Sequence, residues 1–205
     1  TIVKEPVFDI YNWKRAISES GVTTAWMTSG LFNTFVDLDF SLLKGLKTIF
    51  VGGEALSPAH IDRAYENSND LTLYNGYGPT ELTTFTSTYE IPRERTESQA
   101  IPIGHLLQNS HAQIINAEGS IVPIGVPGEL IVASAGMTMG YLNDMEKTNK
   151  TFILKETGTE TKTFYHTGDV VRFDGDVLHY TGRKDKQIKL RGYRIELNDI
   201  EAVLN

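Results

Sequence analysis

The sequence predicts an α/β part followed by a β-rich part, and three observations lead to this fold class. Up to about residue 90, apolar strand-like runs alternate with a helix-like stretch, the order typical of a parallel sheet covered by helices. After residue 90, short alternating runs are separated by turns rich in Gly, Pro and Asp. A last helical pattern, NDIEAVL, opens with Asn198 as its cap. We therefore expect two architectures within the chain and a further short segment at its end.

The N-terminal part is predicted to contain two helices and three strands. Residues 12–19 place apolar side chains at helical spacing, and Gly21 ends that run. Ser57 and Pro58 predict a second helix, with Ser57 as its cap and Pro58 as its first residue. Apolar runs predict the strands, at 22–27 (VTTAWM), 46–56 (LKTIFVGGEAL) and 71–78 (LTLYNGYG).

The C-terminal part is predicted to be β-rich, as a distorted barrel or a sandwich. Its strand-like runs are AQIIN, GELIVAS, VVRF, VLHYTG and KQIKLRGYRIEL. Turn signals such as AEGS at 117–120 and FDGD at 173–176 separate them.

Composition excludes several classes of protein. The chain has 205 residues, 40% of them hydrophobic, and a net charge of −7 without a basic face, so no nucleic-acid partner is expected. No apolar run approaches the roughly 20 residues that span a bilayer, so we expect a soluble, cytoplasmic protein. Cysteine is absent, and the five histidines show no metal-ligand spacing. Neither a G-x-S-x-G elbow nor a G-x-x-x-x-G-K-[ST] loop occurs.

The segment NGYGPTE at 75–81 has the composition of a nucleotide site. Gly76 and Gly78 lack a Cβ and let a ligand approach the backbone. The side chains suited to a nucleotide are Tyr77 for a base, Thr80 for a phosphate oxygen and Glu81 for Mg²⁺. A plain glycine-proline turn with the tyrosine in the core fits this heptad equally well.

Three further segments are candidates, each with a structural alternative. GGEALSP at 52–58 places two glycines before Glu54, as a strand-to-helix turn also would. In YHTGD, Asp169 follows a Thr-Gly turn and could accept two hydrogen bonds from a ribose diol, although an Asx-type turn fits as well. Lys189 and Arg191 could present paired cations from one strand face, or belong to a solvated charged face.

Taken in order, the motifs GGEALSP, NGYGPTE, IPIG, GELIVASAGMTMGYL, YHTGD and GRKDKQIKLRGYRIELNDIE closely resemble the amino-acid adenylation domains of non-ribosomal peptide synthetases. That family belongs to a superfamily with acyl-CoA synthetases and luciferases, and the resemblance covers nearly the whole chain. The residues after Gly182 resemble the amino-acid-activating branch. A D-alanyl carrier-protein ligase is the nearest alternative, and a non-catalytic scaffold with the same fold is another.

The resemblance implies the adenylate-forming enzyme fold and its reaction. Residues 1–90 would be part of the α/β subdomain of a large N-terminal domain, 91–184 a barrel-like subdomain, and 185–205 the hinge and start of a C-terminal subdomain. An amino-acid carboxylate would attack the α-phosphate of ATP, with Mg²⁺ as cofactor, giving an aminoacyl-adenylate and pyrophosphate. The amino acid would then pass to the phosphopantetheine thiol of a peptidyl carrier domain.

Matching positions carry the family's nucleotide roles. Tyr77 would stack on adenine, Thr80 would touch phosphate, and Glu81 would bind Mg²⁺. Asp169 would hold the ribose hydroxyls, and Asp185 would be the hinge. The rest of the implied nucleotide-binding set is Gly52, Gly53, Glu54, Asn75, Gly76, Gly78, Tyr180 and Arg183.

The resemblance also implies an amino-acid pocket. The matching positions are Trp26, Phe50, Gly52, Gly76, Thr84 and Phe85. Bulky aromatic side chains would shorten the pocket while glycines leave room at its wall, which suits a small branched apolar substrate. We expect valine first and isoleucine second, because one methylene is worth only about 1–3 kcal/mol of discrimination. Core packing is the alternative for Trp26 and Phe50.

Some family features are missing from the sequence. It contains neither the phosphate loop nor the catalytic lysine of the C-terminal subdomain. Asp9 imitates the aspartate that grips the substrate amino group, but it lies too close to Trp26. Met139 and His166 stand where the family usually has basic residues. We therefore expect an internal fragment that cannot catalyse adenylation by itself.

Overall fold

The computed structural model describes residues 10–95, 100–158, 160–185, 187–190 and 193–196. The chain divides into two compact units. The first comprises Thr1–Asn75, Glu90–Ile101 and Lys189–Tyr193, and the second comprises Gly76–Tyr89, Pro102–Ile188 and Arg194–Asn205. The subdomain limits expected at residues 90 and 184 stay a prediction, as does the helix NDIEAVL, which lies outside the described residues.

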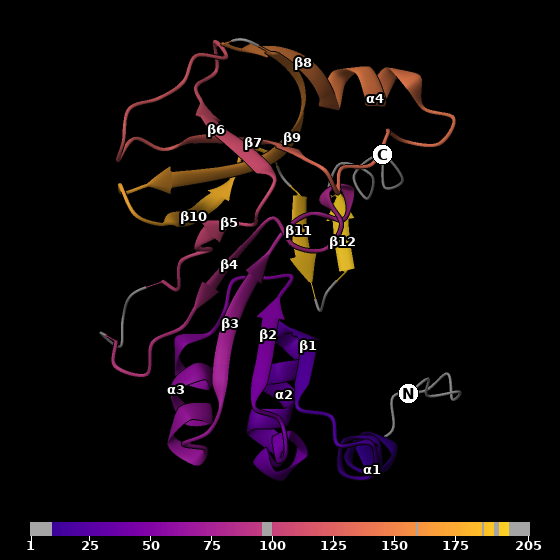
Figure 1. Cartoon of the computed structure of the whole chain (residues 1–205), viewed down its shortest axis with the longest axis vertical. Coiled ribbons are helices and arrows are strands. Elements are labelled where there is room, and N and C mark those ends of the chain that lie inside the picture. The colour runs from indigo at the N-terminus through magenta and orange to yellow at the C-terminus, as the bar shows by residue number, and fades with distance from the viewer. Residues whose placement is uncertain (1–9, 96–99, 159, 186, 191–192, 197–205) are drawn as a thin grey trace, which may run out of the picture. The chain divides into compact units, whose positions relative to one another are not determined.

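The first unit is an α/β layer, and the parallel pairing predicted for it is seen in its first two strands. β1 (Thr24–Thr28) pairs in parallel with β2 (Thr48–Gly52), and β3 (Thr72–Tyr77) is the next strand (Figure 1). Its helices are α1 (Ile10–Ser20), α2 (Ser29–Leu38) and α3 (Pro58–Asn67), with the short 3-10 helix η1 (Phe40–Leu43). The side chains buried between these elements are Met27, Phe32, Phe35, Leu42, Leu43, Ile49, Val51, Ile61, Ala64 and Leu73.

Helix α3 begins where the sequence predicts it, but its cap differs. Pro58 is the first helical residue, a position where its missing N–H costs nothing. Ser57 occupies the cap position without a side-chain bond to the helix backbone. Its Oγ lies 2.7 Å from His60 Nδ1 instead. The prediction of Ser57 as a backbone-capping side chain is therefore wrong.

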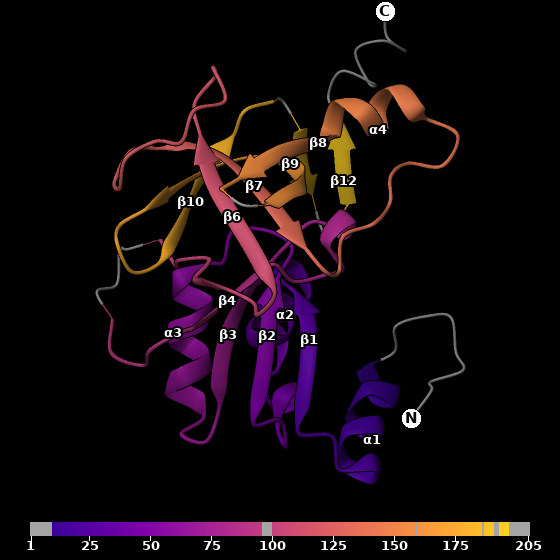
Figure 2. The same ribbon diagram turned by 45° about the horizontal axis from the view of Figure 1, so that its top comes forward.

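The second unit is an antiparallel sheet with strand order β10-β9-β7-β6, and β8 pairs with β9 (Figure 2). The bounds are β6 (Ser110–Ile115), β7 (Gly128–Ser134), β8 (Phe152–Thr157), β9 (Glu160–Phe173) and β10 (Leu178–Arg183). The smaller elements of the chain are η2 (Thr80–Leu82), β4 (Ser87–Glu90), β5 (His105–Leu106), α4 (Met145–Thr151), β11 (Gln187–Leu190) and β12 (Tyr193–Glu196). β4 and β5 are an antiparallel pair in the mixed sheet of order β1-β2-β3-β4-β5, and β11 and β12 form a two-stranded sheet.

This sheet has an apolar core on each side. One cluster comprises Leu82, Ile103, Leu130, Val132, Tyr165, Val171 and Leu178, and the other Ile115, Ile131, Ala133 and Phe164. Adjacent residues of β7 thus point to opposite clusters, as strand geometry requires. The predicted runs AQIIN, GELIVAS, VVRF and VLHYTG all fall on strands of this sheet.

The Thr-Gly turn expected at YHTGD is not a turn between strands. Residues 165–169 lie inside the single long strand β9. The register between β7 and β9 shifts between Glu129 and Ile131, opposite this segment, and Gly168 has a φ of +70°. A local irregularity within a strand, permitted by the glycine, therefore presents Asp169.

None of the helices in the described part of the chain has the length and apolar character needed to cross a membrane.

Candidate nucleotide site

The glycines of NGYGPTE, Gly76 and Gly78, allow residues 84–86 of the same chain to pack closely against this segment. A Cβ at Gly78 would lie 2.6 Å from Thr84 O and 2.7 Å from Thr86 N, and a Cβ at Gly76 would overlap the ring of Phe85. The segment folds back so tightly that Thr86 N donates to Tyr77 O at 2.7 Å. The two glycines are thus required by the packing of residues 84–86 against the end of β3.

Tyr77 and Asp169 are in direct contact although 92 residues separate them. The Tyr77 hydroxyl donates to Asp169 Oδ2 at 2.5 Å, and Arg183 Nη1 donates to Asp169 Oδ1 at 2.7 Å. The Asp169 carboxylate is therefore held from both sides. Burial and the charge of Asp169 together raise the pKa of Tyr77 well above 10, so the phenol stays a hydrogen-bond donor.

Arg183 connects Asp169 to the predicted hinge residue. Its Nε and Nη2 atoms donate to Asp185 Oδ1 and Oδ2 at 2.6 and 2.7 Å, a bidentate pair. Burial alone would lower the pKa of Arg183, but the bonds and charges of the two aspartates outweigh it and raise that pKa. Tyr180 is nearby in β10, and partial burial and the Asp169 charge raise its pKa.

A buried carboxylate that the sequence reasoning missed supports the Asp169 segment. Glu129 Oε1 accepts from Gly168 N at 3.3 Å and contacts His166 Nδ1 at 3.1 Å. Glu129 Oε2 contacts Lys184 Nζ at 3.3 Å. The signal available in the sequence was a charged residue within the otherwise apolar run GELIVAS. His166, at a position where a basic residue was expected, therefore has a carboxylate partner.

Glu81 is a third buried carboxylate of the second unit, beside Glu129 and Asp169, with 6% exposure. It lies in η2, and its Oε1 accepts from the Tyr141 hydroxyl at 2.7 Å. The described residues contain no group of three or more His, Cys, Asp or Glu that could hold a metal. Mg²⁺ bound with a nucleotide needs only one or two carboxylates besides phosphate oxygens, so a single fixed carboxylate fits that ion. Thr80, the neighbour of Glu81, is exposed.

The predicted site residues of the first unit lie within β1, β2 and β3 and in the turn that follows β2. Trp26 pairs with Phe50 and Thr28 with Gly52 in the β1–β2 register. Trp26 is 50% exposed, so core packing does not account for it. Phe50 is partly buried and Asn75 is buried in β3.

The turn after β2 is fixed by one hydroxyl. Ser29 Oγ lies 3.2 Å from Gly52 O and 3.1 Å from Glu54 O, so its single proton is shared between these two acceptors. Gly53 between them has a φ of +86°, a conformation that favours glycine. Of the remaining pocket positions, Gly76, Thr84 and Phe85 belong to the second unit.

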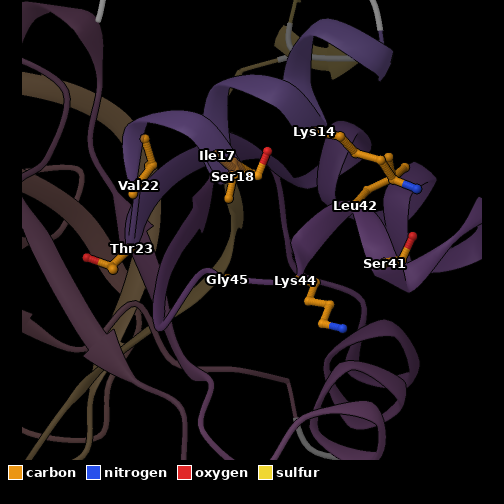
Figure 3. A pocket seen from close by; sticks show the side chains of 10 residues that line it. Lys14, Ile17, Ser18, Val22, Thr23, Ser41, Leu42, Lys44 and Gly45 are labelled. Atoms are coloured by element: carbon orange, nitrogen blue, oxygen red, sulfur yellow. The ribbon is translucent and has the colours of Figure 1, made fainter.

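Two cavities lie away from all of these residues. One of about 600 Å³ in the first unit is lined by α1, η1 and residues 21–23, and Figure 3 shows Lys14 and Lys44 on its rim. The other, about 460 Å³ in the second unit, has apolar walls from β5, β6 and residues 121–124. Neither contains a residue that the sequence predicts for nucleotide or amino-acid binding.

Residues 1–142 match the sequence pattern of the family described as AMP-binding enzyme. The chain belongs to this family. Over 100% of its own length, this chain is 42% identical to tyrocidine synthase 3 of Brevibacillus parabrevis and 40% identical to surfactin synthase subunit 2 of Bacillus subtilis. It spans only 3% and 6% of the lengths of these curated relatives.

The fold of the chain is also similar to that of a solved structure. Holo-PA1221, described as a non-ribosomal peptide synthetase protein containing adenylation and PCP domains, matches with a TM-score of 0.91 and 35% identity. The match covers 98% of this chain and 35% of that chain. The predicted resemblance is confirmed: the chain belongs to the AMP-binding enzyme family, and over nearly its whole length it is similar to non-ribosomal peptide synthetase proteins.

Proposed function

We propose that the protein carrying this chain uses ATP to activate an amino acid as its aminoacyl-adenylate. The observation that carries the proposal is the network in which Tyr77 and Arg183 fix the Asp169 carboxylate. A carboxylate held in this way is preorganised to accept the two hydroxyls of a ribose. Family membership and the similarity to peptide synthetases support the rest of the reaction.

In the proposed reaction, a carboxylate oxygen of the amino acid attacks the α-phosphorus of ATP. The bond from that phosphorus to the bridging oxygen breaks, and pyrophosphate leaves with the electron pair. The residues of this chain contribute by positioning the nucleotide rather than by covalent catalysis. Tyr77 would pack against the base, Asp169 would orient the ribose, and Thr80 would contact a phosphate oxygen. Arg183 would hold the Asp169 carboxylate in place through its bond to Oδ1.

Mg²⁺ would be held by Glu81 together with the phosphate oxygens, and it would neutralise charge on the departing pyrophosphate. The burial of Glu81 and its bond from Tyr141 support this assignment, because both limit the orientations of the carboxylate.

For the substrate we propose valine, with isoleucine second. The side chains that match the family's pocket combine large rings with glycines, and the close packing of Phe85 on Gly76 fixes part of that wall. The half-exposed ring of Trp26 is compatible with this assignment, because part of its surface remains accessible. The activated amino acid would pass to a carrier domain, the arrangement named for PA1221.

Amino-acid-dependent exchange of pyrophosphate into ATP tests the proposal in the full-length protein that carries this chain. We expect exchange with valine, weaker exchange with isoleucine, and a loss of at least about 100-fold in Asp169→Ala. The 205-residue chain alone should give none. Faster exchange with phenylalanine or a charged amino acid would refute the valine assignment. Preference for D-alanine would favour a carrier-protein ligase, and no exchange with any amino acid would favour a scaffold.

A further inference from the structure

Residues 136–141 are tied to the segment of Glu81 at three points. The Tyr141 hydroxyl donates to Glu81 Oε1 at 2.7 Å across a separation of 60 residues. Thr138 N donates to Glu81 O at 2.9 Å, and Thr83 Oγ1 donates to Gly136 O at 2.5 Å. The two segments therefore form one hydrogen-bonded unit around the carboxylate.

Tyr141 is itself held in place by the elements that follow it. Its backbone N–H donates to Thr148 Oγ1 at 2.9 Å. Its ring meets Phe152 edge-on with 5.8 Å between centroids, and Lys147 Nζ lies 4.6 Å from the ring centroid. These contacts with α4 and β8 restrict the orientation of the Tyr141 ring, so its hydroxyl is held in a fixed position.

A phenol suits the orientation of a carboxylate that must bind a cation. A lysine or arginine in the same place would neutralise the negative charge of Glu81, whereas the phenol donates a hydrogen bond and leaves that charge intact. Burial and the bond to Glu81 raise the pKa of Tyr141 far above neutral pH. The hydroxyl is thus a hydrogen-bond donor to Glu81 at neutral pH.

We propose that Tyr141 is a positioning residue that holds the Glu81 carboxylate in the orientation that binds Mg²⁺. The inference rests on the proposed function, because it assumes that Glu81 meets the metal of a bound nucleotide. Tyr141 does not touch the substrate in this scheme and acts only through Glu81.

Tyr141→Phe tests the inference, because it removes the hydroxyl and keeps the ring against Phe152. In the full-length protein with a saturating non-hydrolysable ATP analogue, Mg²⁺ is titrated and the rise in Tm is followed. We expect the half-saturating Mg²⁺ concentration to increase about tenfold, the usual effect of losing a hydrogen bond to a charged group. The Mg²⁺ dependence of pyrophosphate exchange should shift equally, with the KM for the amino acid unchanged.

Tyr74→Phe is the matched control, because the Tyr74 hydroxyl makes an equivalent bond of 2.7 Å to Glu90 Oε2 in the first unit. That variant should leave the Mg²⁺ titration unchanged. In a Glu81→Gln background, Tyr141→Phe should have no further effect on the titration, since the two residues act as one.

A wild-type Mg²⁺ titration in Tyr141→Phe would overturn the inference, even if the rate of exchange fell. An additive effect in the double variant would do the same. Absence of exchange in the wild-type protein would instead count against the proposed function.

Discussion

The backbone at Gly76 lies against the ring of Phe85, and both positions match the proposed amino-acid pocket. Gly76→Ala would place a methyl group on that ring and force the ring to move. We expect a loss of about 1–3 kcal/mol in the free energy of unfolding, the usual cost of overpacking. The displaced ring should also shift substrate preference from valine toward alanine. Thermal unfolding and pyrophosphate exchange with a panel of amino acids measure the two effects.

Gly30→Ala is the control for this substitution. Gly30 lies in α2 with no neighbouring atom within 4 Å of an added Cβ, so alanine there should be neutral or stabilising by up to about 1 kcal/mol. Unchanged stability and substrate preference in Gly76→Ala would show that position 76 does not line the pocket.

At the scale of single residues, the sequence indicates which side chains are candidates for the site, but it does not indicate which of them contact one another. Tyr77, Glu81 and Asp169 were selected by the chemistry of their side chains and by family motifs. The bond between Tyr77 and Asp169 could not be derived, because the sequence does not say which strands become neighbours across 92 residues. Tyr141 was missed for the same reason.

Among the elements, β7 and β9 are held at their register shift by the contacts of one buried carboxylate, Glu129, with His166 and Lys184. Burial by itself raises the pKa of Glu129, but the hydrogen bond and charge of His166 and the charge of Lys184 outweigh it and lower that pKa below its ordinary value of 4.5. A carboxyl group whose pKa is lowered by folding stabilises the fold above its unfolded pKa. That contribution is lost as pH falls through the folded pKa.

Glu129→Gln should therefore reduce stability at neutral pH by about 1–2 kcal/mol. The difference from the wild-type protein should shrink as the pH falls below about 4.5. Thermal unfolding between about pH 3.5 and 7.5 measures it. Glu156→Gln, on the exposed face of β8, is the control and should change stability by less than about 0.5 kcal/mol. A Glu129→Gln defect that is constant over this pH range would mean that packing, and not charge, explains the effect.

Two helices escaped prediction for different physical reasons. α2 contains Gly30 and the β-branched residues Thr34 and Val36, so its apolar pattern resembles the strand that precedes it. α4 buries none of its residues, and hydrophobic periodicity cannot reveal a helix without an apolar face. By contrast, β2, α3 and β3 carry strong local signals and were predicted within a few residues.

On the scale of the whole molecule, the residues proposed to bind the nucleotide gather mainly in the second unit, whereas α1 and η1 belong to the first. Hydrogen exchange with and without Mg²⁺ and a non-hydrolysable ATP analogue tests this distribution. At about a hundredfold excess over Kd, exchange from the segments 76–86 and 165–185 should slow, by up to about 100-fold where opening requires ligand release.

Peptides from α1 (Ile10–Ser20) should exchange at the same rate in both conditions, which makes them an internal control. Asp169→Ala should abolish the slowing in both nucleotide segments, because a ligand that loses its ribose contacts no longer stays bound long enough to protect them. Nucleotide binding in the cavity lined by α1 and η1 would contradict this prediction (Figure 3). If the nucleotide slows exchange there and leaves the segments around Tyr77 and Asp169 unprotected, the site lies in the first unit. The network of Tyr77, Asp169 and Arg183 would then be only a structural connection between strands.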